Sequence, residues 1–163
     1  MKKISIAILF FLIAGCASTT IVGYRGQGYE KNISSVTIIS IASDLETRDS
    51  IEEKLVSSFS KKGINALKTV QLIPFLNNLE SDVDNPELSQ KLKTIMQNSE
   101  AVLTLELEST LGGVPYEWKI ILQTSHGEIW SGKSKTSNTE SLNSALNSLS
   151  IEIVDKLKID GII

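Results

Sequence analysis

The sequence predicts a single α+β domain with a mixed five-stranded sheet, in the order β-α-β-α-β-β-β-α, and with helices packed on the sheet. Three observations carry this prediction. A β-branched run, an amphipathic helical pattern and a second short apolar run follow one another over 36–67, as in a parallel crossover unit. Alternating segments over 101–135 indicate an antiparallel meander. A broad apolar face over 140–157 indicates a closing helix.

The first half of the predicted domain alternates strands with helices. Segment 36–41 is β-branched and almost continuously apolar, which is typical of a central strand buried on both faces. Asp44 is a favourable N-cap and Gly63 follows the last turn, so we expect a helix over about 44–62. A short strand over 64–67 then returns beside the first through a right-handed crossover.

The second half is predicted to contain a second helix, the meander and the closing helix. Pro86 suits the first turn of a helix over about 86–98, which follows a polar connection. His126 and Gly127 form a tight turn within the meander. The closing helix ends before Gly161. The meander strands are expected over 101–110, 116–124 and 128–135.

The composition suits one domain of ordinary size and argues against several kinds of site. The chain has 163 residues and a formal net charge of −3. Loss of Lys2 and Lys3 with a signal peptide would leave a net charge of −5, and no basic stripe indicates a nucleic-acid partner. The single histidine argues against metal or triad chemistry, and the single cysteine leaves no disulfide. We therefore expect no cofactor and no metal.

The amino-terminal residues have the pattern of a secretory signal. Two lysines follow Met1, an apolar run covers 4–13, and the small residues Ala14 and Gly15 precede Cys16. The apolar run is too short to cross a bilayer, which takes about 20 residues. The segment is therefore predicted to be a signal peptide over 1–15, cleaved between Gly15 and Cys16.

Residues 12–16, Leu-Ile-Ala-Gly-Cys, resemble the bacterial lipoprotein box. The resemblance implies that the Cys16 thiol receives a diacylglyceryl group and that the new amine is acylated, with palmitate among the usual chains. Ile13 stands where leucine is commoner in that family. Ala17 is not aspartate, which in enteric-type lipoproteins implies export to the outer membrane. Two or three acyl chains would hold the protein stably.

The segment after the cysteine, 16–34, is small, polar and glycine-bearing. We predict a flexible tether there between the lipid and a domain over 35–163. Its glycines do not make a phosphate-binding loop, because no strand precedes them and no helix follows. Tyr24 and Tyr29 would lie at the membrane surface or pack on the domain.

The predicted domain also resembles small bacterial outer-membrane lipoproteins of unknown function. The resemblance rests on 99–105, on Ile-Trp-Ser-Gly over 129–132 and on the terminal 158–163. The topology is similar to the N-terminal domain of TolB and to lipoprotein activators of cell-wall synthases. That likeness implies protein partners in the cell envelope, although a fold alone does not fix a function.

Four features of the sequence are candidate sites. His126 would be a general base, but no partner for it is visible and a turn residue is favoured. Segment 82–87 resembles a calcium loop, but it has proline and glutamate where a ligand and glycine are needed. The polar face of the closing helix is interpreted as ordinary surface or a docking face. The last candidate is a group of carboxylates on the open face of the meander, Glu106, Glu108 and Glu117. Paired carboxylates could do acid–base chemistry, but the solvent-exposed face of a strand is the simpler interpretation.

Three aromatic residues lie on neighbouring predicted strands, Tyr116, Trp118 and Trp130. Trp118 has the same strand parity as Ile120 and Leu122, so core packing is the favoured interpretation, with an exposed binding patch as the alternative.

Three functions remain open at this point. The first is a lipid-anchored, non-enzymatic binding or adaptor protein for another envelope component. The second is a hydrolase that acts on envelope glycan or peptidoglycan through the surface carboxylates. The third is a structural or small-ligand-carrying lipoprotein. The predicted partners are the membrane, through the lipid on Cys16, and an envelope protein.

Overall fold

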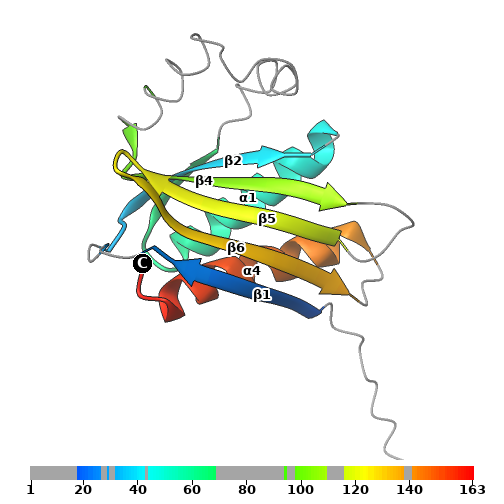
Figure 1. The fold of residues 1–163 in the computed structure, drawn as a ribbon. Coiled ribbons are helices and arrows are strands. Elements are labelled where there is room, and N and C mark those ends of the chain that lie inside the picture. Colours follow the sequence, from blue (N-terminus) through cyan, green and yellow to red (C-terminus); the bar gives the residue numbers. More distant parts are fainter. Residues whose placement is uncertain are drawn as a thin grey trace, which may run out of the picture.

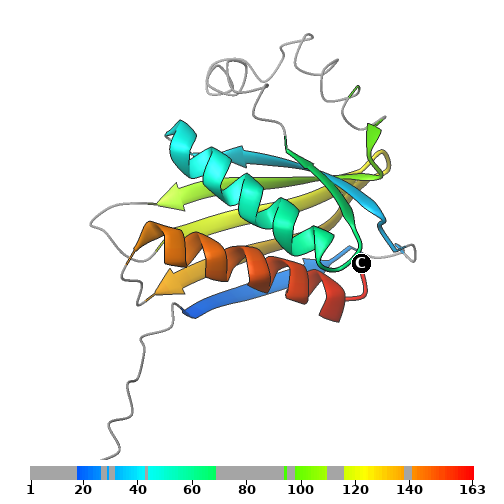
Figure 2. The same ribbon diagram turned by 180° about the vertical axis from the view of Figure 1, so that it is seen from behind.

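The computed structural model describes residues 18–26, 29, 32–42, 44–68, 94, 98–109, 116–137 and 141–163. Within these residues, six strands form one mixed sheet in the order β1-β6-β5-β4-β2-β3. The helices α1 (Leu45–Ser60) and α4 (Leu142–Ile159) cover one face of the sheet (Figures 1 and 2). The strands are β1 (Ser18–Arg25), β2 (Ser35–Ile41), β3 (Asn65–Lys68), β4 (Ala101–Ser109), β5 (Tyr116–Thr124) and β6 (Gly127–Ser137). The predicted α+β class is confirmed.

The parallel half of the sheet forms around β2, which pairs with β3 on one side and β4 on the other. The carboxylate of Asp44 accepts a hydrogen bond from the backbone N–H of Thr47 at 2.7 Å, so the predicted N-cap of α1 is confirmed. This bond from Thr47 holds the pKa of Asp44 below its ordinary value. Gly63, with φ of 80°, then turns the chain into β3.

The antiparallel half is the predicted meander. Strand β4 pairs with β5, and β5 pairs with β6. The chain turns at Ser125 and His126, and Gly127 takes a φ of 115° that favours glycine. Helix α4 packs against the inner face of this half at β1 and β6, whereas α1 packs against β2 and β3. Trp118 and Trp130 are buried in the core, so their predicted place there is confirmed.

The sixth strand corrects the sequence prediction. Strand β1 lies within the segment predicted to be a tether, and it pairs antiparallel with β6 from Ser18 to Arg25. The predicted five strands and the flexible tether over 18–25 were therefore wrong. Alternation carries the physical reason: Ile21 packs on the core, while Val22 and Tyr24 on the other face are exposed. Small residues on the inner face hid this period.

The predicted second helix over 86–98 lies outside the described residues, apart from Thr94 and Asn98, which are helical. The calcium-like segment 82–87 lies outside them as well. The predicted signal peptide, including Gly15, and Cys16 are also outside them.

The indole of Trp130 joins β6, β1 and the end of α4. Its Nε1 donates a hydrogen bond to the Asp160 carboxylate at 2.8 Å, and its ring lies over Gly132 and Gly23. A Cβ added at Gly132 would lie 2.6 Å from the ring, closer than real side chains approach. The two glycines are therefore required by the indole.

Asp160 is the polar centre of this cluster. Its carboxylate also accepts a hydrogen bond from Lys156 at 2.7 Å, and its backbone carbonyl accepts one from Arg25 of β1 at 3.0 Å. Burial acts to raise the pKa of Asp160. The hydrogen bonds from Lys156 and Trp130, with the charges of Lys156 and Arg25, outweigh burial and place the pKa below its ordinary value.

Replacing Gly132 by alanine should lower the free energy of unfolding by about 1–3 kcal/mol, because the new methyl group overpacks the indole. Chemical denaturation measures the change. Ser131→Ala is the matched control, since Ser131 lies on the opposite face, and it should change stability by less than about 0.5 kcal/mol. Equal effects of the two substitutions would contradict the packing.

Replacing Asp160 by asparagine should cost about 1–2 kcal/mol at neutral pH, because charge-assisted hydrogen bonds are lost. Because the pKa of Asp160 is lowered in the folded state, the ionised carboxylate stabilises the fold at pH values above its ordinary pKa of 3.8. This stability is lost as the pH falls from 3.8 through the lower pKa of the folded state.

The difference between wild type and Asp160→Asn should therefore shrink over that acidic range, in denaturation experiments at a series of pH values. Asp155→Asn is the control: Asp155 lies on the same helix and pairs with Lys62, but its side chain is 46% exposed. A constant difference across the range would contradict the assignment.

Candidate functional site

The face of the sheet away from the helices is the candidate site, and we call it the open face (Figure 1). It is formed by the outward side chains of β1, β4, β5 and β6. Charged side chains occupy its centre, and exposed apolar side chains of β1 lie at its margin.

The structure brings the three predicted glutamates onto the open face and pairs each with a lysine. Glu106 lies 3.8 Å from Lys119, Glu108 3.0 Å from Lys133, and Glu117 3.2 Å from Lys135, measured between carboxylate oxygen and ammonium nitrogen. Sequence reasoning missed these lysines. They alternate along β5 and β6 with the same parity as the outward positions, which is the signal that could have found them.

These carboxylates do not have the environment of a catalytic pair. Acid–base chemistry needs one carboxyl group that burial keeps protonated beside one that stays ionised. The side chains of Glu106, Glu108 and Glu117 are 50%, 31% and 41% exposed, and each has a cationic partner. The three carboxylates are therefore partly hydrated members of surface ion pairs, which contribute little to stability.

An apolar patch lies beside the charged rows. It consists of Val22, Tyr24 and Ile121, and the side chains of Val22 and Tyr24 are 54% and 71% exposed. The patch borders a shallow, open hollow of about 480 Å³ that Lys119 and Lys133 also line. Sequence reasoning missed this patch because it assigned β1 to a tether.

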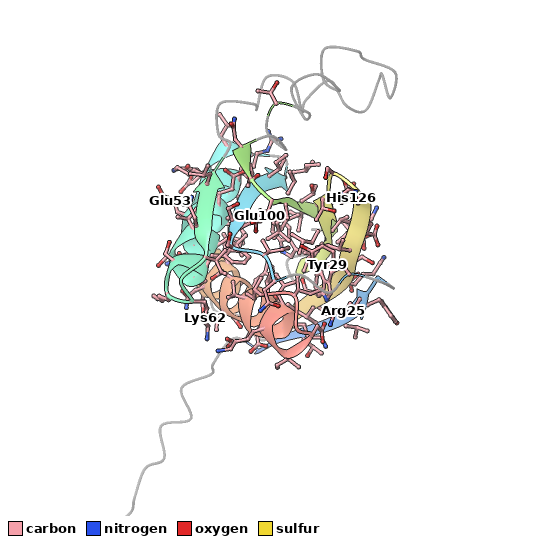
Figure 3. The ribbon with its side chains drawn as sticks, turned by 90° about the vertical axis from the view of Figure 1, so that its left-hand side faces the viewer. Arg25, Tyr29, Glu53, Lys62, Glu100 and His126 are labelled. Carbon is pink, nitrogen blue, oxygen red and sulfur yellow. The ribbon has the colours of Figure 1, made fainter. Side chains whose placement is uncertain are left out.

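Tyr24 and Tyr29 differ in their surroundings. Tyr24 is outward on β1, whereas Tyr29 packs against the core, which is one of the two predicted alternatives. Burial raises the pKa of Tyr29, and the negative charge of Glu100 raises it further. The Arg25 guanidinium donates a hydrogen bond to the backbone carbonyl of Tyr29. Tyr29 therefore belongs to the structural cluster at the end of β1 (Figure 3).

The other candidates lie apart from the open face. His126 is exposed in its turn at one end of the sheet (Figure 3), which confirms the favoured interpretation as a turn residue. The polar face of α4, with Asn143, Ser144 and Asn147, is exposed on the helical layer. Trp118 and Trp130 are buried, so the alternative of an exposed tryptophan patch was wrong; the side chain of Tyr116 is not described.

Buried charged side chains serve the packing of α1. Glu52 is 3% exposed, and its carboxylate accepts hydrogen bonds from the backbone N–H and the hydroxyl of Ser40, at 3.0 and 2.8 Å. Arg48 is 6% exposed and donates to the carbonyl of Ala42. Both side chains join α1 to β2, which satisfies polar groups that burial would otherwise leave unpaired.

The described residues lack two kinds of feature, a metal-binding group and a membrane-spanning helix. Within the described ranges, no group of three or more His, Cys, Asp or Glu side chains is placed to hold a metal ion. The helices of the described part include none with the length and apolarity that a membrane span needs.

Comparison with solved structures shows the fold. The PelC dodecamer from Paraburkholderia phytofirmans has a TM-score of 0.55 at 14% identity, covering 86% of this chain and 97% of that chain. A variant of that protein gives 0.54 at 15% identity, with coverage of 86% and 97%. Lipoprotein GNA1162 from Neisseria meningitidis gives 0.46 at 15%, covering 80% and 99%. No protein-family model and no curated protein matches the chain. The likeness to TolB stays a prediction.

Replacing Glu108 by alanine should change the free energy of unfolding by less than about 1 kcal/mol, because a surface ion pair contributes little. Glu52→Ala is the contrasting variant: it leaves the buried N–H of Ser40 without its acceptor and should cost about 2–3 kcal/mol. Chemical denaturation compares the two. If Glu108→Ala lowered the free energy of unfolding as much as Glu52→Ala, the ion pairs of the open face would be major contributors to stability, which would contradict this interpretation.

Proposed function

We propose that this chain is a lipid-anchored protein of the cell envelope that binds another envelope component and is not an enzyme. The single observation that carries the proposal is the ordered signal that ends at Cys16: positive start, short apolar run, small residues and cysteine. Ala17, rather than aspartate, favours the outer membrane as its destination.

The open face is the proposed binding surface. Val22 and Tyr24 expose apolar side chains on an edge strand, beside lysines and glutamates that could make directional contacts with a partner. Tyrosine beside aliphatic side chains is typical of the centre of protein interfaces, with charged residues at the rim. The partner is therefore expected to present an apolar centre with charges around it.

The surroundings of the carboxylates on the open face count against the alternative of an envelope glycan or peptidoglycan hydrolase. Its three glutamates are partly exposed and paired with lysines. The small-ligand alternative is also disfavoured, because ligand pockets bury most of their ligand and the hollow beside Tyr24 is open to solvent.

Replacing Cys16 by serine should prevent lipid attachment and move the protein out of the membrane fraction. Metabolic labelling with palmitate and fractionation of cells measure both effects. Ala17→Asp is the matched control for sorting: it keeps the thiol, so it should keep the label while changing the membrane that carries it. A protein that stays membrane-bound and labelled after Cys16→Ser would contradict the anchor.

A photo-crosslinking side chain at position 24 should form a defined adduct with one envelope component in living cells, because Tyr24 is exposed in the proposed interface. The matched control is position 151 on α4, where Ile151 is 43% exposed on the helical layer. The adduct at 24 should be lost in a Val22→Asp variant. The same adducts at both positions, or none at 24, would contradict a binding role for the open face.

A further inference from the structure

The connection between the proposed lipid anchor and the folded domain is very short. Only Ala17 lies between Cys16 and Ser18, the first residue of β1. Two residues of extended chain span at most about 7 Å. The first residue of the sheet is therefore within about 7 Å of the residue that would carry the lipid, whatever conformation the joining residues adopt.

The sheet register shows which other elements share this end of the domain. Ser18 pairs with Ser137 at the end of β6, whereas Arg25 pairs with Trp130 near its beginning. The parallel strands β2 and β4 finish at the same end, because β4 runs antiparallel to β5, which begins there opposite Thr136. Both helices also begin at this end, and they run from it toward the carboxyl terminus (Figures 1 and 2).

The beginnings of the two helices form a common surface there. Residues Asp44 and Glu46 of the α1 start line a hollow of about 490 Å³ together with Ser141 and Leu142 of the α4 start. Leu45 and Leu142 expose 57% and 36% of their surface, so each helix presents one apolar side chain at this end. Asp44 and Glu46 are acidic, so attraction to anionic lipid is not what would hold this surface to a membrane.

We propose that this end of the domain, with Leu45, Leu142 and the start of β1, lies directly on the phospholipid headgroups of the membrane that holds the lipid anchor. The inference rests on the proposed function, because it requires the lipid on Cys16. The occupant of this surface is the bilayer, since a connection of about 7 Å keeps the end of the sheet next to the acyl chains.

The orientation of the whole domain follows. Strand β6 has 11 residues and therefore extends roughly 35 Å, at about 3.3 Å per residue. The turn at His126 lies at the far end, together with Arg25 and Tyr29 (Figure 3). The strands thus run away from the membrane surface. The open face is therefore roughly perpendicular to the membrane plane and does not lie on the bilayer. A partner on the open face would meet Tyr24 well above the headgroups.

The test uses the full-length lipidated protein in phosphatidylcholine and phosphatidylethanolamine vesicles. A fluorophore is attached to a new cysteine at Asn143→Cys, on the first turn of α4, or at His126→Cys, in the far turn; both positions are exposed. A nitroxide on the lipid headgroup quenches fluorophores close to the bilayer. Quenching at 143 should be severalfold stronger than at 126.

A second variant carries a flexible insert of about ten Gly and Ser residues between Ala17 and Ser18, which lengthens the connection without changing the domain. Vesicle flotation should show that the insert variant is still anchored, while its quenching at 143 falls toward the value at 126. In the protein without the insert, equal quenching at positions 143 and 126, or stronger quenching at 126, would overturn the orientation.

Flotation also separates this inference from the proposed function. A full-length protein without acyl chains that does not float with the vesicles would overturn the anchor, and the orientation with it. A protein that floats but shows equal quenching would overturn the orientation alone. If quenching at 143 stays high with the insert, contact depends on the surface itself and not on the short connection, which would overturn the geometric argument.

Discussion

The hydrogen bond between the Trp130 indole and the Asp160 carboxylate is the interaction on which the rest of the structure depends. It joins β6, the strand beside the edge strand β1, to the end of α4, and the same aspartate holds Arg25 at the end of β1 through its backbone carbonyl. The ring fills the space above Gly132 and Gly23, so any side chain at these positions of β6 and β1 would crowd the indole. The last residues add to this closure, because Ile162 is buried and its carbonyl accepts a hydrogen bond from Ile33.

Incorporation of β1 into the sheet changes what the protein can do. With a free tether, the domain could sample a large volume around the proposed anchor and present any face to the membrane. With β1 paired along its whole length, Ser18 of the sheet is only two positions from Cys16, and a lipid on Cys16 would constrain the orientation of the domain. The same strand also supplies Val22 and Tyr24, which form the exposed apolar part of the open face. One element therefore links the proposed anchor to the proposed binding surface.

Sequence patterns predicted the elements with a strong local period and missed those whose position depends on contacts far along the chain. The cap at Asp44, the meander and the closing helix have local signals, and the structure confirms them. The inner face of β1 carries small residues because the indole of Trp130, more than a hundred positions later, occupies the space there. No local pattern therefore revealed the strand. The glutamates of the open face were found from alternation, but their lysine partners depend on strand register. Segments 129–132 and 158–163, which carry the resemblance to small lipoproteins, meet in space through the hydrogen bond between Trp130 and Asp160. The sequence alone did not predict this contact.

The most direct test of this account is hydrogen–deuterium exchange over residues 18–25 in the lipidated, full-length protein. The alternate amides of β1 that pair with β6 should exchange slowly, and their protection should fall when Gly132 is replaced by alanine. Exchange throughout 18–25 at the rate of an unstructured peptide would contradict it. That result would restore a flexible tether and remove both the apolar patch and the fixed orientation at the membrane.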